Sequence, residues 1–308
     1  MMLFCTRLFA LVAVAFAGVV VARRTCVDGS LVAHNGSSVG YERVFDGVNM
    51  YVSEPEKGTA RDGVAVLYLT DVFGIQLLQN RLLADSFARA GYLTLAPDLF
   101  NGTPAPVDLT SPGTPAFNTS AFLAQHAPNT TDPLVTTALN TLHTHFHTSR
   151  IAITGYCFGG RYALRFLSPT HTPSAQVAYA AHPSLLEDGE IQAVGGPVGV
   201  AFAEVDGMVG PERRGVVEGL LGGTGVPYVV GLFGGTSHGF GVRANESSKK
   251  RRREDEKTRR REDEKTRRRE DEKTKVASLG LTTHYLDRTC YSYNLRISVQ
   301  FSFFGYAI

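Results

Sequence analysis

Cysteine, net charge and long apolar runs are all scarce in this sequence of 308 residues. It contains four cysteines, and its formal net charge is only +2. The few cysteines exclude a fold held together by a dense disulfide framework. The longest N-terminal apolar run, Leu8–Ala22, is too short to span a bilayer comfortably, which argues against a stable membrane anchor. With 43% hydrophobic residues, the chain can bury the core of one large α/β domain or two small ones.

The first 22 residues have the pattern of a cleaved signal peptide. Arg7 supplies the positive charge, Leu8–Ala22 is the apolar region, and the small residues that end at Ala22 suit signal peptidase. We therefore expect a secreted, extracellular protein; the alternative is a retained N-terminal membrane helix. Sequons for glycosylation agree with secretion and predict a glycoprotein; they begin at Asn35, Asn101, Asn118, Asn129 and Asn245.

Removal of the signal peptide leaves three cysteines: Cys26, Cys157 and Cys290. In an oxidising compartment Cys26 and Cys290 could form a disulfide, which would leave Cys157 as a free thiol. Nothing in the sequence brings the two ends of the chain together, so whether they pair stays open.

The most informative stretch is Ile151–Leu167. An apolar run of strand length leads into Gly155-Tyr-Cys-Phe-Gly-Gly160, and a helical pattern follows. This is the arrangement of a nucleophile elbow with sulfur in place of oxygen. The N-terminus of the following helix favours a thiolate at Cys157, and the Phe158 N–H is placed to stabilise an oxyanion. The alternative is that Cys157 is a buried, inert side chain.

A cysteine nucleophile needs a base and a group that orients the base, and elbow hydrolases supply an acid and then a histidine downstream. The apolar runs Pro197–Ala203 and Pro227–Phe233 predict two buried strands. Asp206 and His238 follow just past their carboxyl ends, where open α/β sheets place their ligands. Their order and position predict the acid and the base.

These motifs occur with three others, and together they resemble the fungal branch of the dienelactone hydrolase family over about residues 40–245. The segments are Thr70–Gly74, Ala96–Gly102, Gly155–Arg161, Ala181–Leu186 and Ser237–Arg243. The resemblance implies an α/β-hydrolase fold, a mostly parallel sheet flanked by helices, and a Cys157, Asp206, His238 triad. It further implies hydrolysis of a small-molecule ester or lactone substrate, with no metal or organic cofactor. It also implies that the backbone N–H of Val72 is the second oxyanion donor.

Four further side chains are candidates for substrate binding or proton handling. Bacterial members of the family carry Glu where Asp71 stands, and that Glu is thought to manage the thiol proton. Asp71 could have the same role. The alternative is a loop acid that caps a helix at Gln76 or faces water. Arg161 and Arg243 could bind a substrate carboxylate or make structural ion pairs. His182, at the end of the predicted strand Val177–Ala181, competes with His238 as base, but chain order favours a pocket-wall role.

A second literal elbow pattern, Gly235–Gly239, has Ser237 at its centre. No amphipathic helix follows it, so we do not expect Ser237 to be the nucleophile.

Upstream, the patterns predict a strand or hairpin over 43–52, a strand at Val64–Thr70, a helix at Gln79–Ala90 and a strand at Tyr92–Ala96. Asp132 and Pro133 predict the start of a helix that runs to about Phe146. Its histidines fan out, which argues against a metal site.

After Asn245 the chain changes character. Residues 251–274 are three identical copies of Arg-Arg-Arg-Glu-Asp-Glu-Lys-Thr, which have no apolar face to bury. Residues 249–275 hold 15 basic and 9 acidic side chains, which gives this tract a net charge of +6. Because the whole chain has a net charge of +2, the rest of the chain has a net charge of −4. The interleaved acids weaken phosphate attraction, and we expect no nucleic acid partner.

We therefore predict a signal peptide at 1–22, a hydrolase domain at 23–245, a charged low-complexity repeat at 246–275 and an atypical C-terminal tail at 276–308. By resemblance, a long final helix should follow the catalytic histidine, and it is missing. Two rival interpretations remain: an inactive hydrolase fold, or a basic-tail binding protein whose folded part is a scaffold. Oligomeric state stays open.

Overall fold

A computed structural model describes residues 36–61, 63–107 and 117–243. The predicted signal peptide, Cys26 and Cys290, the sequons at Asn35 and Asn245, and the charged tail lie outside the described residues. The predicted domain boundaries at residues 22 and 245 lie outside them too.

The described residues build one eight-stranded mixed sheet, which confirms the predicted α/β fold with its mostly parallel sheet. The strand order is β1-β2-β4-β3-β5-β6-β7-β8. β1 and β2 form an antiparallel hairpin, β2 pairs antiparallel with β4, and the remaining neighbours are parallel. The strands are β1 (Tyr41–Phe45), β2 (Val48–Ser53), β3 (Val64–Leu69), β4 (Leu93–Pro97), β5 (Arg150–Tyr156), β6 (Val177–Ala181), β7 (Val198–Val205) and β8 (Tyr228–Ser237).

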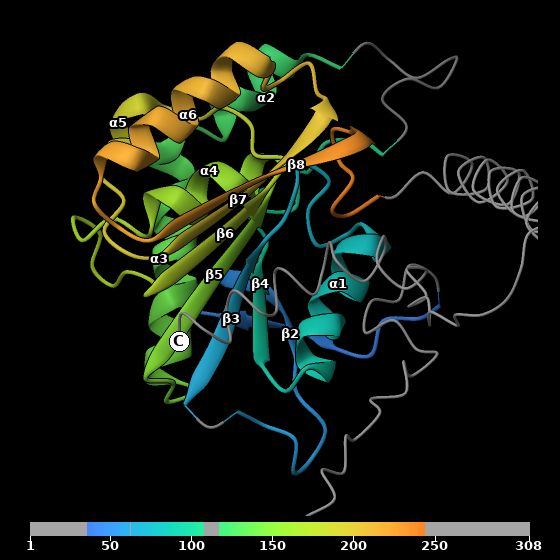
Figure 1. The fold of residues 1–308 in the computed structure, drawn as a ribbon. Helices are drawn as coiled ribbons and strands as arrows, with labels where there is room; N and C mark the ends of the chain where they lie inside the picture. The colour runs from blue at the N-terminus through green and yellow to red at the C-terminus, as the bar shows by residue number, and fades with distance from the viewer. Residues whose placement is uncertain (1–35, 62, 108–116, 244–308) are drawn as a thin grey trace, which may run out of the picture. The chain divides into compact units, whose positions relative to one another are not determined.

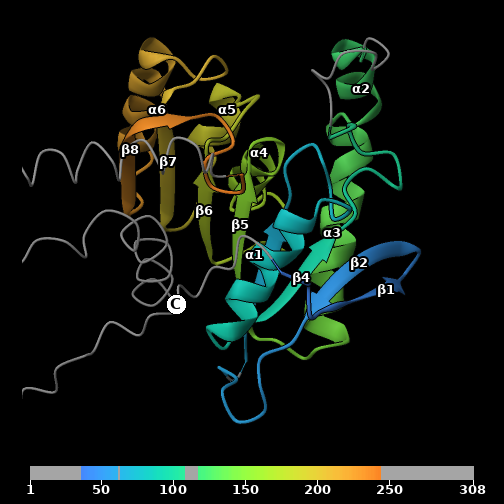
Figure 2. The same cartoon turned by 90° about the vertical axis from the view of Figure 1, so that its right-hand side faces the viewer.

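Helices cover both faces of the sheet, but unequally. Figure 1 shows α1 on one face and α3, α4, α5 and α6 on the other, and Figure 2 shows the same arrangement after a quarter turn. Among the described residues none of these helices is both long and apolar enough to cross a membrane. The helices are α1 (Leu78–Arg89), α2 (Thr119–Gln125), α3 (Pro128–Thr144), α4 (Phe158–Arg165), α5 (Asp188–Gln192) and α6 (Pro211–Gly223).

The central strand β3 explains why the chain reads as continuous apolar runs. All six of its residues are buried. Ala65, Leu67 and Leu69 pack into the core on the side of α3 and α4, while Val66 and Tyr68 pack into the core on the side of α1. Because alternate residues point to opposite faces, a strand covered on both sides must be apolar throughout.

The predicted start of α3 is wrong. We expected Asp132 to cap this helix and Pro133 to be its first residue, but it begins at Pro128 with Ala127 as its N-cap. Pro128 has the same advantage as Pro133 at a first helical position, where the missing N–H would have no partner. The Asp132 carboxylate instead accepts hydrogen bonds from Arg165 on α4.

Candidate active site

Cys157 occupies the sharp turn between β5 and α4 that the sequence predicts. Its backbone has a φ of 51°, a left-handed value that non-glycine residues rarely adopt. The flanking glycines make the turn possible, because a Cβ on Gly155 would lie 2.1 Å from the Gly159 carbonyl oxygen and a Cβ on Gly159 would lie 2.4 Å from that of Leu69. The side chain is therefore held at the carboxyl end of the central strands and at the N-terminus of a helix.

Asp206 and His238 come together just past the ends of β7 and β8, as predicted. The His238 Nδ1 lies 2.9 Å from Asp206 Oδ2 and 3.1 Å from Oδ1. A register irregularity near Val205 pairs that residue with Ser237, so the acid and the histidine leave the sheet at the same level. The Met208 N–H donates to Asp206 Oδ1 at 2.8 Å and fixes the carboxylate.

The electrostatics of His238 link it to both partners. Burial alone lowers the pKa of this imidazole, but interactions with the Cys157 side chain and the Asp206 carboxylate outweigh burial and raise the pKa to about 9. The pairing needs a proton on Nδ1, which directs the other ring nitrogen away from Asp206. His238 is thus a candidate proton acceptor for Cys157.

The two predicted oxyanion donors belong to neighbouring segments of the site. Val72 is in the loop after β3, and Phe158 is the first residue of α4. Within the described residues neither backbone N–H donates a hydrogen bond. The Gly159 N–H donates to the Thr70 carbonyl at 3.1 Å, which ties the β3 loop to the elbow. The structure therefore holds the two donor segments in contact, while their role stays a prediction.

Asp71 neither caps a helix nor faces water, so both structural alternatives from the sequence are wrong. It is fully buried, and α1 begins at Leu78 without a side-chain cap. Its Oδ1 accepts hydrogen bonds from Asn80 and from the Phe73 N–H, and its Oδ2 lies 3.4 Å from Arg243 Nε. Burial raises the pKa of the Asp71 carboxyl, while Arg243 acts in the opposite direction.

Arg243 has the structural pairing that the sequence left as one of two alternatives. Its guanidinium lies over the Phe73 ring at 4.2 Å and next to Asp71. The side chain is still partly exposed. It thus borders the same loop that carries the Val72 N–H.

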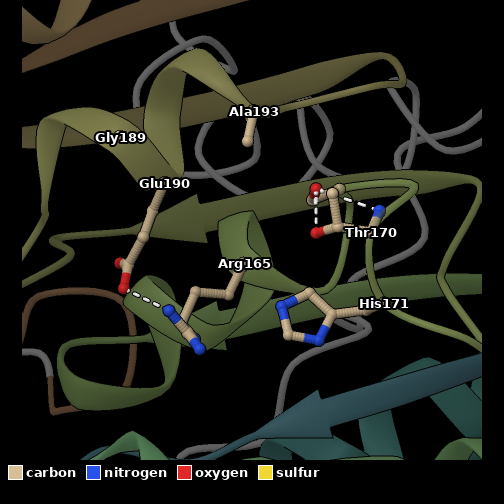
Figure 3. Close-up of a pocket in the computed structure, with 7 residues that line it drawn as sticks. Arg165, Thr170, His171, Gly189, Glu190 and Ala193 are labelled. Atoms are coloured by element: carbon tan, nitrogen blue, oxygen red, sulfur yellow. Dashed lines mark hydrogen bonds and ion pairs between the residues drawn. The ribbon is translucent and has the colours of Figure 1, made fainter.

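Of the two roles that the sequence left open for Arg161, the structure shows the structural ion pair. Its Nε and Nη2 donate to the Glu190 carboxylate on α5 at 2.7 to 3.1 Å. The neighbouring Arg165 donates to Glu190 and Asp132. It borders a cavity of about 270 Å³, and Figure 3 shows its side chain turned toward Glu190. These charges are already paired, and the sequence could not reveal the partner on α5.

His182 lies in the site but is buried behind His238. It is fully buried, its ring meets that of His238 edge-on at 5.0 Å between centroids, and neither ring nitrogen has a hydrogen-bond partner among the described residues. Burial and the nearby His238 hold its pKa well below the usual value, so the ring is neutral. Its packing against the His238 ring agrees with the pocket-wall role.

Ser184 is a site residue that our sequence analysis missed. Its hydroxyl lies 3.6 Å from Cys157 Sγ, and its N–H donates to the Cys157 carbonyl at 3.0 Å. A serine shortly after a strand is ordinary in loops. Its position three residues past a predicted strand in the central sheet was the available signal.

Among the described residues no group of three or more His, Cys, Asp or Glu side chains could hold a metal ion.

Comparisons with known proteins identify the family of this chain. Residues 48–264 match the dienelactone hydrolase family. Hydrolase pyvD of Aspergillus violaceofuscus is 36% identical over 227 residues, which cover 74% of this chain and 88% of that protein. A carboxymethylenebutenolidase homolog of Mus musculus is 28% identical over 72% of this chain and 86% of its own. A solved Klebsiella pneumoniae structure assigned to the dienelactone hydrolases shares the fold, with a TM-score of 0.55, 17% identity and coverage of 67% and 90%.

Proposed function

Because this chain belongs to the dienelactone hydrolase family and is accordingly a carboxylic ester or lactone hydrolase, we propose that Cys157, His238 and Asp206 perform the hydrolysis through a thioester. The observation that carries this proposal is the geometry: Cys157 sits in a strained elbow at the carboxyl end of the sheet, and the Asp206 carboxylate holds His238 Nδ1 at 2.9 Å. In support, interactions with the Cys157 side chain and with Asp206 raise the pKa of that imidazole to about 9. Such a perturbed group beside a nucleophile is typical of catalytic sites.

In the first half of the proposed reaction, His238 accepts the Cys157 proton and the thiolate attacks the carbonyl carbon of the ester or lactone. Asp206 keeps the proton of Nδ1 in place and stabilises the imidazolium that forms. The N–H groups of Val72 and Phe158 hold the oxyanion. The imidazolium then gives its proton to the departing alkoxide, and the acyl group remains on sulfur.

In the second half, water hydrolyses the thioester. His238 removes a proton from the water, the resulting hydroxide attacks the acyl carbon, and the carbon–sulfur bond breaks. The same oxyanion donors stabilise the second tetrahedral intermediate. The His238 imidazolium returns its proton to the departing Cys157 sulfur, the carboxylic acid product leaves, and both residues are back in their starting states. No step requires a metal or an organic cofactor.

The experiment that tests the proposal is selective alkylation of the purified protein. Iodoacetamide should label Cys157, as mapped by peptide mass spectrometry, and hydrolysis of a simple aryl ester should fall in proportion to the labelling. Adding an excess of ester before the reagent should slow the labelling. Robust hydrolysis by fully alkylated protein would refute the mechanism, and a pure protein with no esterase activity would favour the inactive-fold alternative.

Export of the protein is a separate proposal. Of the five predicted sequons, those at Asn101, Asn118 and Asn129 lie within the described residues, and all three asparagines are exposed. Exposure is what glycosylation of a folded surface requires. We propose that the protein is secreted and glycosylated. A loss of apparent mass after glycosidase treatment of protein recovered from the medium would test this, and unglycosylated protein retained inside the cells would contradict it.

A further inference from the structure

The turn after β6 touches both members of the proposed catalytic pair. It contains two non-glycine residues in the left-handed region, His182 with a φ of 37° and Leu185 with a φ of 57°. Such conformations persist only where the surroundings impose them. Two backbone hydrogen bonds do so here: the His182 N–H donates to Ala201 at 2.7 Å, and the Ser184 N–H donates to Cys157 at 3.0 Å. The turn is therefore anchored to the elbow itself.

This anchoring brings the Ser184 hydroxyl to the nucleophile. Its Oγ lies 3.6 Å from Cys157 Sγ, within hydrogen-bond range for sulfur, and Ser184 is only 2% exposed. Within the described part of the chain the sulfur is the one hydrogen-bond partner found for this hydroxyl. It does not cap the nearby α5, whose N-cap is Glu187. Helix capping and backbone bonding thus leave the position of this hydroxyl unexplained.

The chemistry of the pair sets the direction of the hydrogen bond. A thiolate carries no proton and can only accept, whereas a serine hydroxyl can donate one. Hydrogen bonds to charged groups stabilise the charged form more than the neutral form. A donor fixed beside sulfur therefore stabilises the thiolate that His238 generates and holds the sulfur in one position.

We propose that Ser184 is a positioning residue that donates a hydrogen bond to the Cys157 thiolate before substrate binds. This inference rests on the proposed function, because it assumes that Cys157 is the nucleophile. Ser184 keeps its own proton throughout: the thiol proton goes to His238, and the hydrogen bond weakens as the sulfur shares its electron pair with the carbonyl carbon. The hydroxyl thus acts on the resting thiolate and not on the oxyanion.

The test measures iodoacetamide alkylation of Cys157 against pH in Ser184→Ala, with aryl ester hydrolysis measured in parallel. Near pH 6 alkylation should be about 5- to 10-fold slower than in the unmodified protein, since a hydrogen bond to a charged group is lost. Near pH 10 the two rates should converge, because the thiol is then ionised without help. A merely structural defect would lower the rate equally at every pH.

The other titratable and charged groups near the pair remain unchanged in this variant. They are Asp71 after β3, His182 after β6, Asp206 after β7, His238 after β8, and Arg243. Ser184→Thr keeps the hydroxyl and should restore the alkylation profile to within about 2-fold. Ser168→Ala is a matched control, because Ser168 is 3% exposed and its hydroxyl pairs with Thr170, away from the elbow. Its profile should match that of the unmodified protein.

The outcomes separate the inference from the proposed function. If Cys157→Ala retains ester hydrolysis, the thioester mechanism fails whatever Ser184 does. If Cys157→Ala is inactive but the Ser184→Ala profile overlays that of the unmodified protein, only the role of Ser184 is overturned. A uniform loss of alkylation across the pH range, with or without a lower melting temperature, also overturns it.

Discussion

Helix α4 separates two polar clusters that differ in how well their polar atoms are hydrogen-bonded. From the middle and the C-terminal end of the helix, Arg161 and Arg165 donate to Glu190 and Asp132 through several short hydrogen bonds. At its N-terminal end the site contains buried polar atoms without hydrogen-bond partners among the described residues: Thr70 Oγ1, Asp71 Oδ2 and both ring nitrogens of His182. Unsatisfied buried polar atoms are costly, so proteins retain them where function requires them.

The two polar clusters around this one helix serve different purposes. The ion-pair cluster fastens α3, α4 and α5 together and contributes stability. The N-terminal end holds a strained cysteine, a neutral buried histidine and a carboxyl whose pKa burial raises, and all three are destabilising in isolation. Substitutions at the first cluster should change stability without activity, and those at the second should do the reverse.

The largest effect should come from Cys157→Ala. Removing the nucleophile should lower kcat/KM for an aryl ester by about 1000-fold or more, because the remaining donors can stabilise only an uncatalysed attack by water. The melting temperature should stay the same or rise, since alanine is smaller and uncharged. Steady-state kinetics and a thermal scan check both expectations, and near-normal kcat/KM would refute the assignment of Cys157.

Asp206→Asn should have the next largest effect. The amide keeps the shape but removes the charge, so the pKa of His238 should fall from about 9 toward its usual value of 6.5. We expect kcat/KM to fall by roughly 100-fold or more, because the imidazole loses its orientation and the support for its positive charge. Proton NMR titration of His238 together with kinetics gives the measurement. An unchanged titration would show that the pairing with Asp206 is unimportant in solution.

The raised pKa of His238 also predicts a pH dependence of stability. Because the pKa of His238 in the folded protein, about 9, exceeds the usual 6.5, folding favours the protonated imidazole. The resulting contribution to the free energy of unfolding is fully present below about pH 6.5. It should be lost as pH rises from 6.5 through about 9. Urea unfolding at a series of pH values should show this decline, and the decline should flatten in Asp206→Asn. Equal slopes in the two proteins would contradict the link.

Arg165→Met breaks the satisfied cluster. It leaves Asp132 and Glu190 with fewer partners, and both acids and the arginine are largely buried. We expect the free energy of unfolding to fall by about 2 kcal/mol, between the values typical of exposed and fully buried pairs. The kcat/KM should remain within about 2-fold. Asp188→Asn, which removes an exposed pair with Arg213, is the control and should cost less than about 1 kcal/mol.

The smallest expected effect is that of His182→Phe. Replacing two unpartnered ring nitrogens by carbon should leave stability unchanged or raise it by about 1 kcal/mol. The kcat/KM should nevertheless fall several-fold, because the ring that packs edge-on against His238 changes shape. Urea unfolding and kinetics on the same preparation check both. A clear loss of stability with full activity would show that His182 contributes to stability and not to catalysis.

Much of the fold could be predicted because apolar periodicity is local. The run Val64–Thr70 predicted β3, and Val177–Ala181 predicted β6 with the bounds that the structure shows. The start of α3 could not be predicted, because proline suits the first turn equally at Pro128 and Pro133. In the structure Asp132 lies inside the helix and pairs with Arg165 on another element, a contact that the local pattern does not contain.

The elbow could be predicted from adjacent residues, because a cysteine among glycines between a strand and a helix is a local pattern, and so could the acid and the histidine that follow the next strands. The pairing of Arg161 with α5, the pairing of Arg243 with Asp71 and the contact of Ser184 with the nucleophile became visible only in the folded chain. The cause of this difference is the distance along the sequence between the residues that interact. Backbone conformation and apolar pattern are written in neighbouring residues, whereas the partner of a polar side chain is chosen by whichever distant segment the sheet brings within about 3 to 4 Å of it.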